Sequence, residues 1–167
     1  MDNKEKIMNT TLIIYYSYEG NCRLISELLS PIFPADVVEL KPKAEKRLTG
    51  LKKYFWLGKQ AKMKETPELE PITIDFSHYE TIIIGTPVWA WTMAPAIRTF
   101  LSSKPFAGKR IAFYCTHGGN PGKTIEHMEK MLEGNTFIGN CEFKEPKSDA
   151  LEGVTEICKE WAEKIKK

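Results

Sequence analysis

The sequence predicts an α/β fold, a three-layer α/β/α sandwich around a five-stranded parallel sheet. Short apolar runs of the length of buried strands alternate along the chain with longer segments of helical period. The clearest run, Thr81–Gly85, is rich in β-branched residues and suits a strand that is covered on both faces. Three of the turns that follow the strands are also unusually rich in glycine, proline, tryptophan and hydroxyl groups. The 167 residues, 42% of them hydrophobic, are enough for one domain with a full core.

The first strand and helix form the opening of a βαβ unit. An apolar run from Leu12 to Tyr16 leads into a polar turn that contains glycine, and apolar residues then recur at helical spacing as far as Leu29. Two prolines end this helix, and residues 36–40 are predicted to form a short second strand.

A basic segment, about 43–66, follows the second strand. Between Lys41 and Lys64 nine Lys or Arg residues face one acid, a net charge of +8, which leaves −6 for the rest because the chain totals +2. Glycines interrupt an apolar face that includes Leu51 and Phe55, so the segment is predicted to be a pair of short helices or a helical loop. Such a segment is either a solvated helical face or a surface for a dinucleotide phosphate, an acidic redox partner or single-stranded nucleic acid. No nucleic-acid-binding signature accompanies it, so no nucleic acid is predicted as a partner.

The C-terminal half repeats the alternation of strand and helix. Pro95 suits the first turn of a helix, where a backbone amide would have no intrahelical partner. The strands are predicted at 81–85, 110–115 and 136–143, and the helices at 96–101, around 125–132 and at 150–165.

Composition argues against several classes of protein. The four cysteines show neither a CxxC pair nor the spacing of metal ligands, so reduced thiols and no metal site are predicted. No apolar run is long enough to cross a membrane, and no signal peptide is recognisable. Residues 1–9 are predicted to be a flexible N-terminal segment, followed by one domain over 10–167 of a cytoplasmic protein without a membrane partner.

The turns after the first, third and fourth strands are predicted to form one composite ligand site. In an open parallel sheet, ligands bind beyond the carboxyl ends of the strands, where the strand order reverses. No catalytic side chain is predicted among the site residues. They are Ser17, Tyr18, Glu19, Gly20, Asn21 and Cys22 in the first turn, Thr86, Pro87, Val88, Trp89 and Ala90 in the second turn, and Thr116, His117, Gly118, Gly119 and Asn120 in the third turn.

The first turn has the character of a phosphate cradle. It exposes backbone amides at the start of a helix, where the helix dipole favours an anion, and it holds no lysine. Neutral donors and a dipole suffice for a phosphomonoester. The G-x-x-x-x-G-K-[ST] motif of nucleoside triphosphate sites is absent.

The chain resembles the flavodoxin superfamily over nearly its whole length, and the resemblance includes these three turns in order. The first turn matches the family's S-x-T-G-N-T phosphate loop at Ser17, Gly20 and Asn21. Residues 86–89 resemble the family's second loop, which contacts the isoalloxazine ring, and residues 116–120 resemble the third loop. The resemblance implies strand order 2-1-3-4-5 and non-covalently bound FMN.

Two residues of the first turn depart from the family pattern. Glu19 and Cys22 stand where the family usually has hydroxyl residues. Because a carboxylate close to a phosphate dianion is repulsive, Glu19 is expected to point outward and to offer only its amide. Cys22 is either a small buried residue or, at the start of a helix, a thiol with a lowered pKa.

The second and third turns are expected to contact the flavin ring. Residues 87–90 would frame one side of it, with the amides of Ala90 and Thr92 as candidates for contact with flavin N5, and residues 116–120 would lie at its pyrimidine edge. His117 is the one ring in the third turn, so the outer flavin face is either open or covered by Trp56 or a neighbouring chain. His117 is either a solvated loop histidine or a group that stabilises the anionic reduced flavin.

These features predict an FMN-binding redox protein of the flavodoxin family that acts in electron transfer. The alternative is an FMN-dependent NAD(P)H or quinone oxidoreductase on the same fold. The expected partners are accordingly redox proteins or NAD(P)H, and the oligomeric state is left open.

Overall fold

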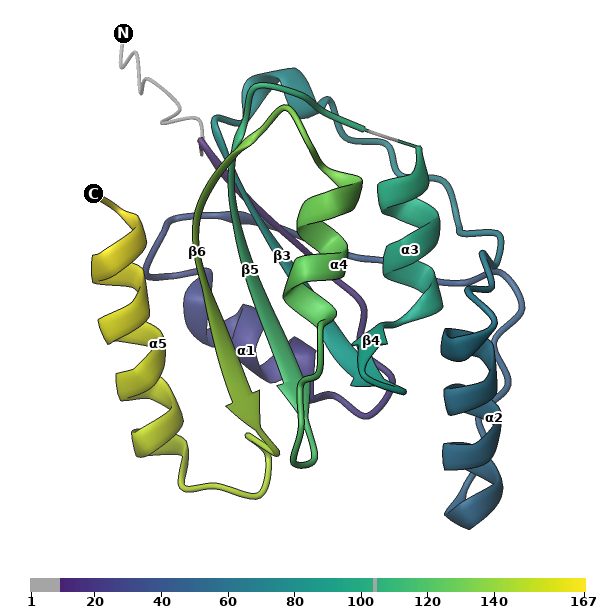
Figure 1. Cartoon of the computed structure of the whole chain (residues 1–167). Helices are drawn as coiled ribbons and strands as arrows, with labels where there is room; N and C mark the ends of the chain where they lie inside the picture. Colours follow the sequence, from purple (N-terminus) through teal and green to yellow (C-terminus); the bar gives the residue numbers. More distant parts are fainter. Residues whose placement is uncertain (1–9, 104) are drawn as a thin grey trace, which may run out of the picture.

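The structure is a computed structural model, and it describes residues 10–103 and 105–167. A parallel sheet lies between two layers of helices (Figure 1). The fold class predicted from the sequence is therefore confirmed. The predicted N-terminal segment, residues 1–9, lies outside the described residues.

The central sheet has five parallel strands in the order β2-β1-β3-β5-β6. This is the implied order 2-1-3-4-5, because β4 is a two-residue strand that pairs only with the end of β3. The strands are β1 Thr11–Tyr15, β2 Asp36–Glu39, β3 Thr81–Trp89, β4 Thr92–Met93, β5 Arg110–His117 and β6 Thr136–Lys144.

The helices cover both faces of the sheet. α1 and α5 bury a cluster that includes Ile13 of β1, whereas α3 and α4 pack over the neighbouring Leu12 and Ile14. Successive side chains of β1 thus enter opposite cores, as a strand between two helical layers requires. The helices are α1 Asn21–Leu29, α2 Gly50–Lys62, α3 Pro95–Ser102, α4 Thr124–Met131 and α5 Leu151–Ile165, with a short 3₁₀ helix at Phe76–His78.

The basic segment contains one continuous helix, α2, and the prediction of two short helices or a helical loop is wrong. Gly58 lies inside α2 without interrupting it, although glycine costs about 1 kcal/mol relative to alanine in a helix interior. Buried Leu57 and Ala61 anchor α2, so packing outweighs local propensity. α2 contacts β3 and β4 at one side of the molecule (Figure 1).

β3 and β5 are longer than predicted. β3 continues to Trp89 because its last residues pair with β4, and β5 continues to His117 because β6 runs beside it to Lys144. The second and third turns therefore begin inside strands, which gives their first residues the fixed positions of a sheet.

The described part of the chain contains no helix that is both long and apolar enough to cross a membrane. Within residues 10–103 and 105–167, no group of three or more His, Cys, Asp or Glu side chains is arranged to hold a metal ion.

Candidate functional site

An open cleft of about 220 Å³ lies at the carboxyl ends of the strands. All three predicted turns contribute to it, and so do α2 and the turn between β6 and α5, here called the fourth turn. The lining residues from the predicted turns are Glu19, Asn21, Pro87, Val88, Trp89, Ala90, Thr116, His117 and Gly118. The others are Tyr54, Leu57 and Gly58 of α2 and Glu145 of the fourth turn.

Ser17 organises the first turn. Its buried Oγ accepts hydrogen bonds from the amides of Gly20, at 3.1 Å, and Arg23, at 3.3 Å. Gly20 has a φ of 90°, a left-handed conformation that glycine adopts without steric cost, and α1 begins at the next residue. The hydroxyl hydrogen of Ser17 remains able to donate toward a ligand.

Backbone amides of the first turn are free to bind an anion. Among the described residues, the amides of Glu19, Asn21 and Cys22 donate to no other group of the protein. The first amides of a helix have no intrahelical partners, and the helix dipole adds partial positive charge there. The first turn therefore has the donor set of an anion site.

A lysine from the fourth turn lies against the first turn. Lys147 donates from Nζ to the Glu19 carbonyl oxygen at 2.8 Å and from its amide to Asn21 Oδ1 at 3.2 Å. Its side chain also packs over Gly20, where a Cβ atom would be 3.3 Å from Nζ. Although the first turn contains no lysine in sequence, the fold supplies one in space.

The Glu19 side chain is turned toward α2. Its carboxylate forms an ion pair with Lys53, whose ammonium group also lies 4.4 Å from the centre of the Tyr54 ring. The ion pair neutralises the charge that would otherwise repel a phosphate. It also ties α2 to the first turn.

Tyr18 is a structural residue of the first turn. Its buried hydroxyl accepts a hydrogen bond from the Leu48 amide at 2.7 Å and donates to the Lys46 carbonyl oxygen at 2.9 Å. The Arg47 guanidinium lies 4.6 Å from the centre of its ring. Tyr18 thus fixes the chain that leads into α2.

Trp89 forms an aromatic wall of the cleft. Its ring meets Tyr16 and Tyr18 edge to face, at centroid distances of 5.6 and 5.8 Å. Such pairs hold an aromatic ring in a defined orientation. Trp89 is only partly buried, and it lines the cleft with Pro87, Val88 and Ala90.

The second turn ends in a tight hairpin. Ala90 and Trp91 both adopt left-handed backbone conformations, with φ of 49° and 62°. Trp91 is exposed and does not line the cleft, and Thr92 is buried with its Oγ1 2.8 Å from His127 Nδ1. Of the two residues considered for contact with a flavin, Ala90 therefore lines the cleft and Thr92 does not.

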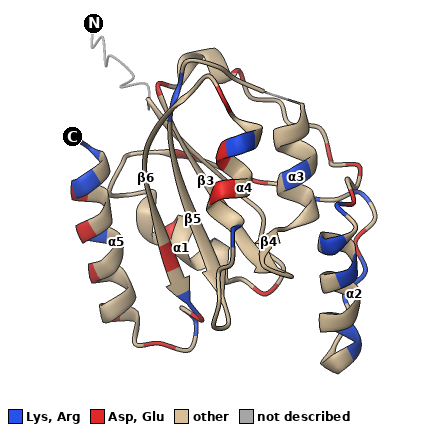
Figure 2. Ribbon diagram, viewed as in Figure 1, with Lys and Arg blue, Asp and Glu red and all other residues tan. Residues whose placement is uncertain are grey.

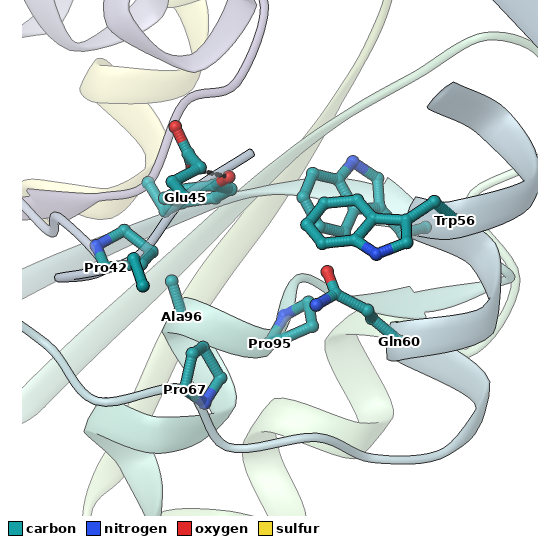
Figure 3. A pocket seen from close by; sticks show the side chains of 10 residues that line it. Pro42, Glu45, Trp56, Gln60, Pro67, Pro95 and Ala96 are labelled. Atoms are coloured by element: carbon teal, nitrogen blue, oxygen red, sulfur yellow. Dashed lines mark hydrogen bonds between the residues drawn. The ribbon is translucent and has the colours of Figure 1, made fainter. Parts of the chain in front are cut away.

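A second cavity shares Trp89 with the cleft. Its other lining residues include Pro42, Glu45, Trp56, Gln60 and Pro95 (Figure 3). Its volume of about 20 Å³ has room for about one water molecule, so it is not a ligand site. Trp56 lines this cavity and not the cleft.

Tyr16 and Glu45, which both line this second cavity, form a hydrogen-bonded pair. The Tyr16 hydroxyl donates to Glu45, and burial, reinforced by this carboxylate, raises the pKa of Tyr16 well above its usual range. Tyr16 therefore stays neutral and serves as a fixed support for Trp89.

The third turn contributes its first half to the cleft. His117 Nδ1 accepts a hydrogen bond from the Gly119 amide at 3.1 Å, which fixes the ring and leaves the proton of the neutral ring on Nε2. Gly119 and Asn120 are exposed and do not line the cleft. Asn120 instead accepts a hydrogen bond from the Gly122 amide at 2.8 Å and shapes the turn.

Two predicted site residues are wholly buried beside the cleft. Thr86 accepts a hydrogen bond from the Ala94 amide at 3.0 Å and holds the hairpin. The Cys22 thiol lies 3.2 Å from Thr116 Oγ1, and burial raises its pKa to about 12. Of the two alternatives for Cys22, the small buried residue is therefore correct, and the thiol with a lowered pKa is wrong.

Cys22 should resist alkylation in the native protein. A raised pKa means that the reactive thiolate is scarce below about pH 11, and the buried sulfur is also inaccessible. We expect iodoacetamide at pH 8 to leave the peptide that contains Cys22 unmodified until guanidinium chloride is added, as followed by mass spectrometry. Labelling of Cys22 in the native protein faster than Cys141, the one cysteine that is partly exposed, would contradict this prediction.

The sequence did not predict Tyr54, Leu57, Gly58 and Glu145 of the cleft, nor Lys53 and Lys147 beside the first turn. The α2 residues lie in a segment in which glycines obscure the helical pattern, so the sequence alone does not tell which side chains face the sheet. Glu145 and Lys147 follow the last strand, and that position was a usable signal, because this turn also lies at the carboxyl edge of the sheet.

Comparison with known proteins places the chain in a family. The family model described as Flavodoxin matches residues 10–165. A flavoprotein from Lactobacillus acidophilus NCFM, solved in complex with FMN, is 27% identical, with 84% of this chain and 97% of that chain covered and a TM-score of 0.68. No curated protein matches the sequence.

Two more distant structures share the fold. A protein from Bacteroides uniformis is 21% identical, with 93% of this chain and 98% of that chain covered and a TM-score of 0.73. The flavodoxin of Megasphaera elsdenii is 15% identical, with coverages of 92% and 98% and a TM-score of 0.53. The family model spans nearly the whole chain, and the sheet of this chain has the strand order that the family resemblance implies. The chain therefore belongs to the flavodoxin family.

Proposed function

We propose that the chain binds FMN in the cleft and acts in electron transfer. The cofactor predicted from the sequence is confirmed by the family match and by the relative solved with FMN. The observation that carries the proposal is the set of free amides at the start of α1, next to a cleft with an aromatic wall.

The residues present fit the phosphate group of FMN. The amides of Glu19, Asn21 and Cys22 and the Ser17 hydroxyl would donate to its oxygens, and Gly20 provides the turn that brings them together. Lys147 adds a positive charge beside them. The carboxylate of Glu19, which belongs to the first turn itself, is neutralised by Lys53.

The flavin ring would lie between the second and third turns. Pro87, Val88, Trp89 and Ala90 would frame one side of the ring, and the third turn from Thr116 would contact its pyrimidine edge. His117 would present the proton on Nε2 toward the cleft, since Nδ1 is engaged by Gly119. When bound, FMN supplies the acceptance and release of one or two electrons, so the chain need only bind and orient it.

The proposal is tested by loading the protein with FMN and titrating it with dithionite under anaerobic conditions. For an electron carrier we expect two separate one-electron steps, with an organic-radical signal in the EPR spectrum at half reduction. Protein that stays colourless after incubation with FMN and dialysis would refute cofactor binding, and a direct two-electron course would refute the carrier role.

One observation favours the alternative, an FMN-dependent NAD(P)H or quinone oxidoreductase. Trp56 lines the second cavity and not the cleft, and Tyr54, which does line the cleft, is 64% exposed, so neither ring is buried against Trp89 as a second aromatic wall. A dissociable hydride donor would therefore have access. Bleaching of the bound flavin by stoichiometric NADPH or NADH under argon would support this alternative, and no bleaching would exclude it for these donors.

A further inference from the structure

The outer side of α2 exposes large apolar side chains. Leu51 is 87% exposed, Phe55 80% and Tyr54 64%. Leu51 and Phe55 are four residues apart and are therefore neighbours on the helix surface. Scattered exposed apolar residues are common, but a contiguous group on one helix marks an interaction site.

Lysines surround this apolar group. Lys52, Lys59 and Lys62 fall with Phe55 on one helical face, at spacings of three and four residues. All three are exposed, and none has an ion pair within the described residues. Figure 2 shows Lys and Arg gathered on α2 and the chain beside it. We call Leu51, Lys52, Tyr54, Phe55, Lys59 and Lys62 the α2 face.

The α2 face is held in place beside the cleft. On its inner side, α2 is anchored by buried Leu57 and Ala61 and by the ion pair of Lys53 with Glu19. Tyr54 belongs both to the α2 face and to the lining of the cleft. A molecule bound to the α2 face would therefore stand at the mouth of the cleft.

We propose that the α2 face is the docking surface for an acidic redox protein. An apolar centre with a charged rim is the usual anatomy of a protein–protein interface. The segment from Lys41 to Lys64 carries +8, whereas the rest of the chain carries −6, so an acidic partner is attracted to α2 more strongly than to the rest of the chain. This polarity favours orientations in which the partner's redox centre approaches the cleft. The inference rests on the proposed electron-transfer function.

The test measures binding of a purified ferredoxin of strongly negative net charge to the FMN-loaded protein by isothermal titration calorimetry. One double variant, Lys52→Glu with Lys59→Glu, reverses the charge of the α2 face. The other, Leu51→Ser with Phe55→Ser, removes its apolar centre. Lys53 is left intact because it is bonded to Glu19. Matched controls are Lys159→Glu and Ile157→Ser, which are exposed changes on α5 at the opposite side of the sheet.

We expect each α2 variant to raise the Kd at least about tenfold and each α5 control to leave it within about twofold. Raising the salt concentration from about 0.05 to about 0.3 M should weaken binding of the unmodified chain, and it should matter much less for the Lys52→Glu, Lys59→Glu variant. Dithionite reduction of the bound FMN should be the same in all variants, because none of these changes replaces a residue that lines the cleft.

Several results would overturn the proposal. Equal Kd values for the α2 variants and the unmodified chain, or no binding of the ferredoxin at all, would do so. So would flotation with phosphatidylserine vesicles or a concentration-dependent dimer that depends on Leu51 and Phe55, since a membrane or a second copy would then occupy the face. If FMN is bound and reduced stepwise in these same samples, the proposed function stands while the docking surface fails.

Discussion

The variant Gly85→Ala should lose about 3 kcal/mol of unfolding free energy. A Cβ atom at this position in β3 would lie 1.9 Å from Cζ and 2.2 Å from the hydroxyl oxygen of Tyr114. Tyr114 is fully buried, and its hydroxyl donates to the Cys22 carbonyl oxygen at 2.9 Å and lies 2.7 Å from Ser26 Oγ. The added methyl group would displace this ring and with it the link between the sheet and α1.

Urea unfolding of Gly85→Ala and of a matched control measures this effect. Gly153→Ala makes the same change inside α5, where a Cβ atom meets nothing within 4 Å, and it should stabilise the protein by roughly 0.5–1 kcal/mol. In a Tyr114→Leu background the cost of Gly85→Ala should shrink, because the clashing atoms are gone. An undiminished cost in that background would show that the Tyr114 ring is not the cause.

The variant Lys147→Gln should weaken FMN binding about tenfold, ~1.4 kcal/mol, and leave riboflavin binding unchanged. Riboflavin lacks the phosphate, so only a charge that acts on the phosphate discriminates between the two ligands. Quenching of flavin fluorescence gives both dissociation constants. The loss should decrease as salt is added, because Lys147 is exposed.

Lys144→Gln is the control for this prediction. Lys144 is exposed at the end of β6, three residues earlier, and forms no side-chain hydrogen bond or ion pair with the first turn. Its replacement should change FMN affinity far less. An equal loss for FMN and riboflavin in Lys147→Gln would mean that Lys147 acts by holding the Glu19 carbonyl oxygen and not through its charge.

Local signals were sufficient for the fold and for part of the site. The β1 strand, the Ser17–Gly20 turn and the start of α1 are contiguous, so their pattern can be read without knowledge of the rest. The ion pair of Glu19 with Lys53 and the contact of Lys147 with Gly20 could not be predicted, because they join residues 34 and 127 positions apart. The sequence predicts Gly85 only as a strand residue. That Gly85 leaves room for the Tyr114 ring depends on the register of β3 and β5, which the sequence does not reveal.

The lysine-rich α2 also affects how the molecule behaves on charged chromatography media. The isoelectric point of 8.3 and the small net charge of the chain describe a nearly neutral protein, yet Lys and Arg gather on α2 and the chain beside it, and the segment from Lys41 to Lys64 alone carries +8 (Figure 2). A strongly polarised molecule presents opposite ends to anionic and cationic resins and is retained by both at low ionic strength. The isoelectric point is therefore a poor guide to its purification.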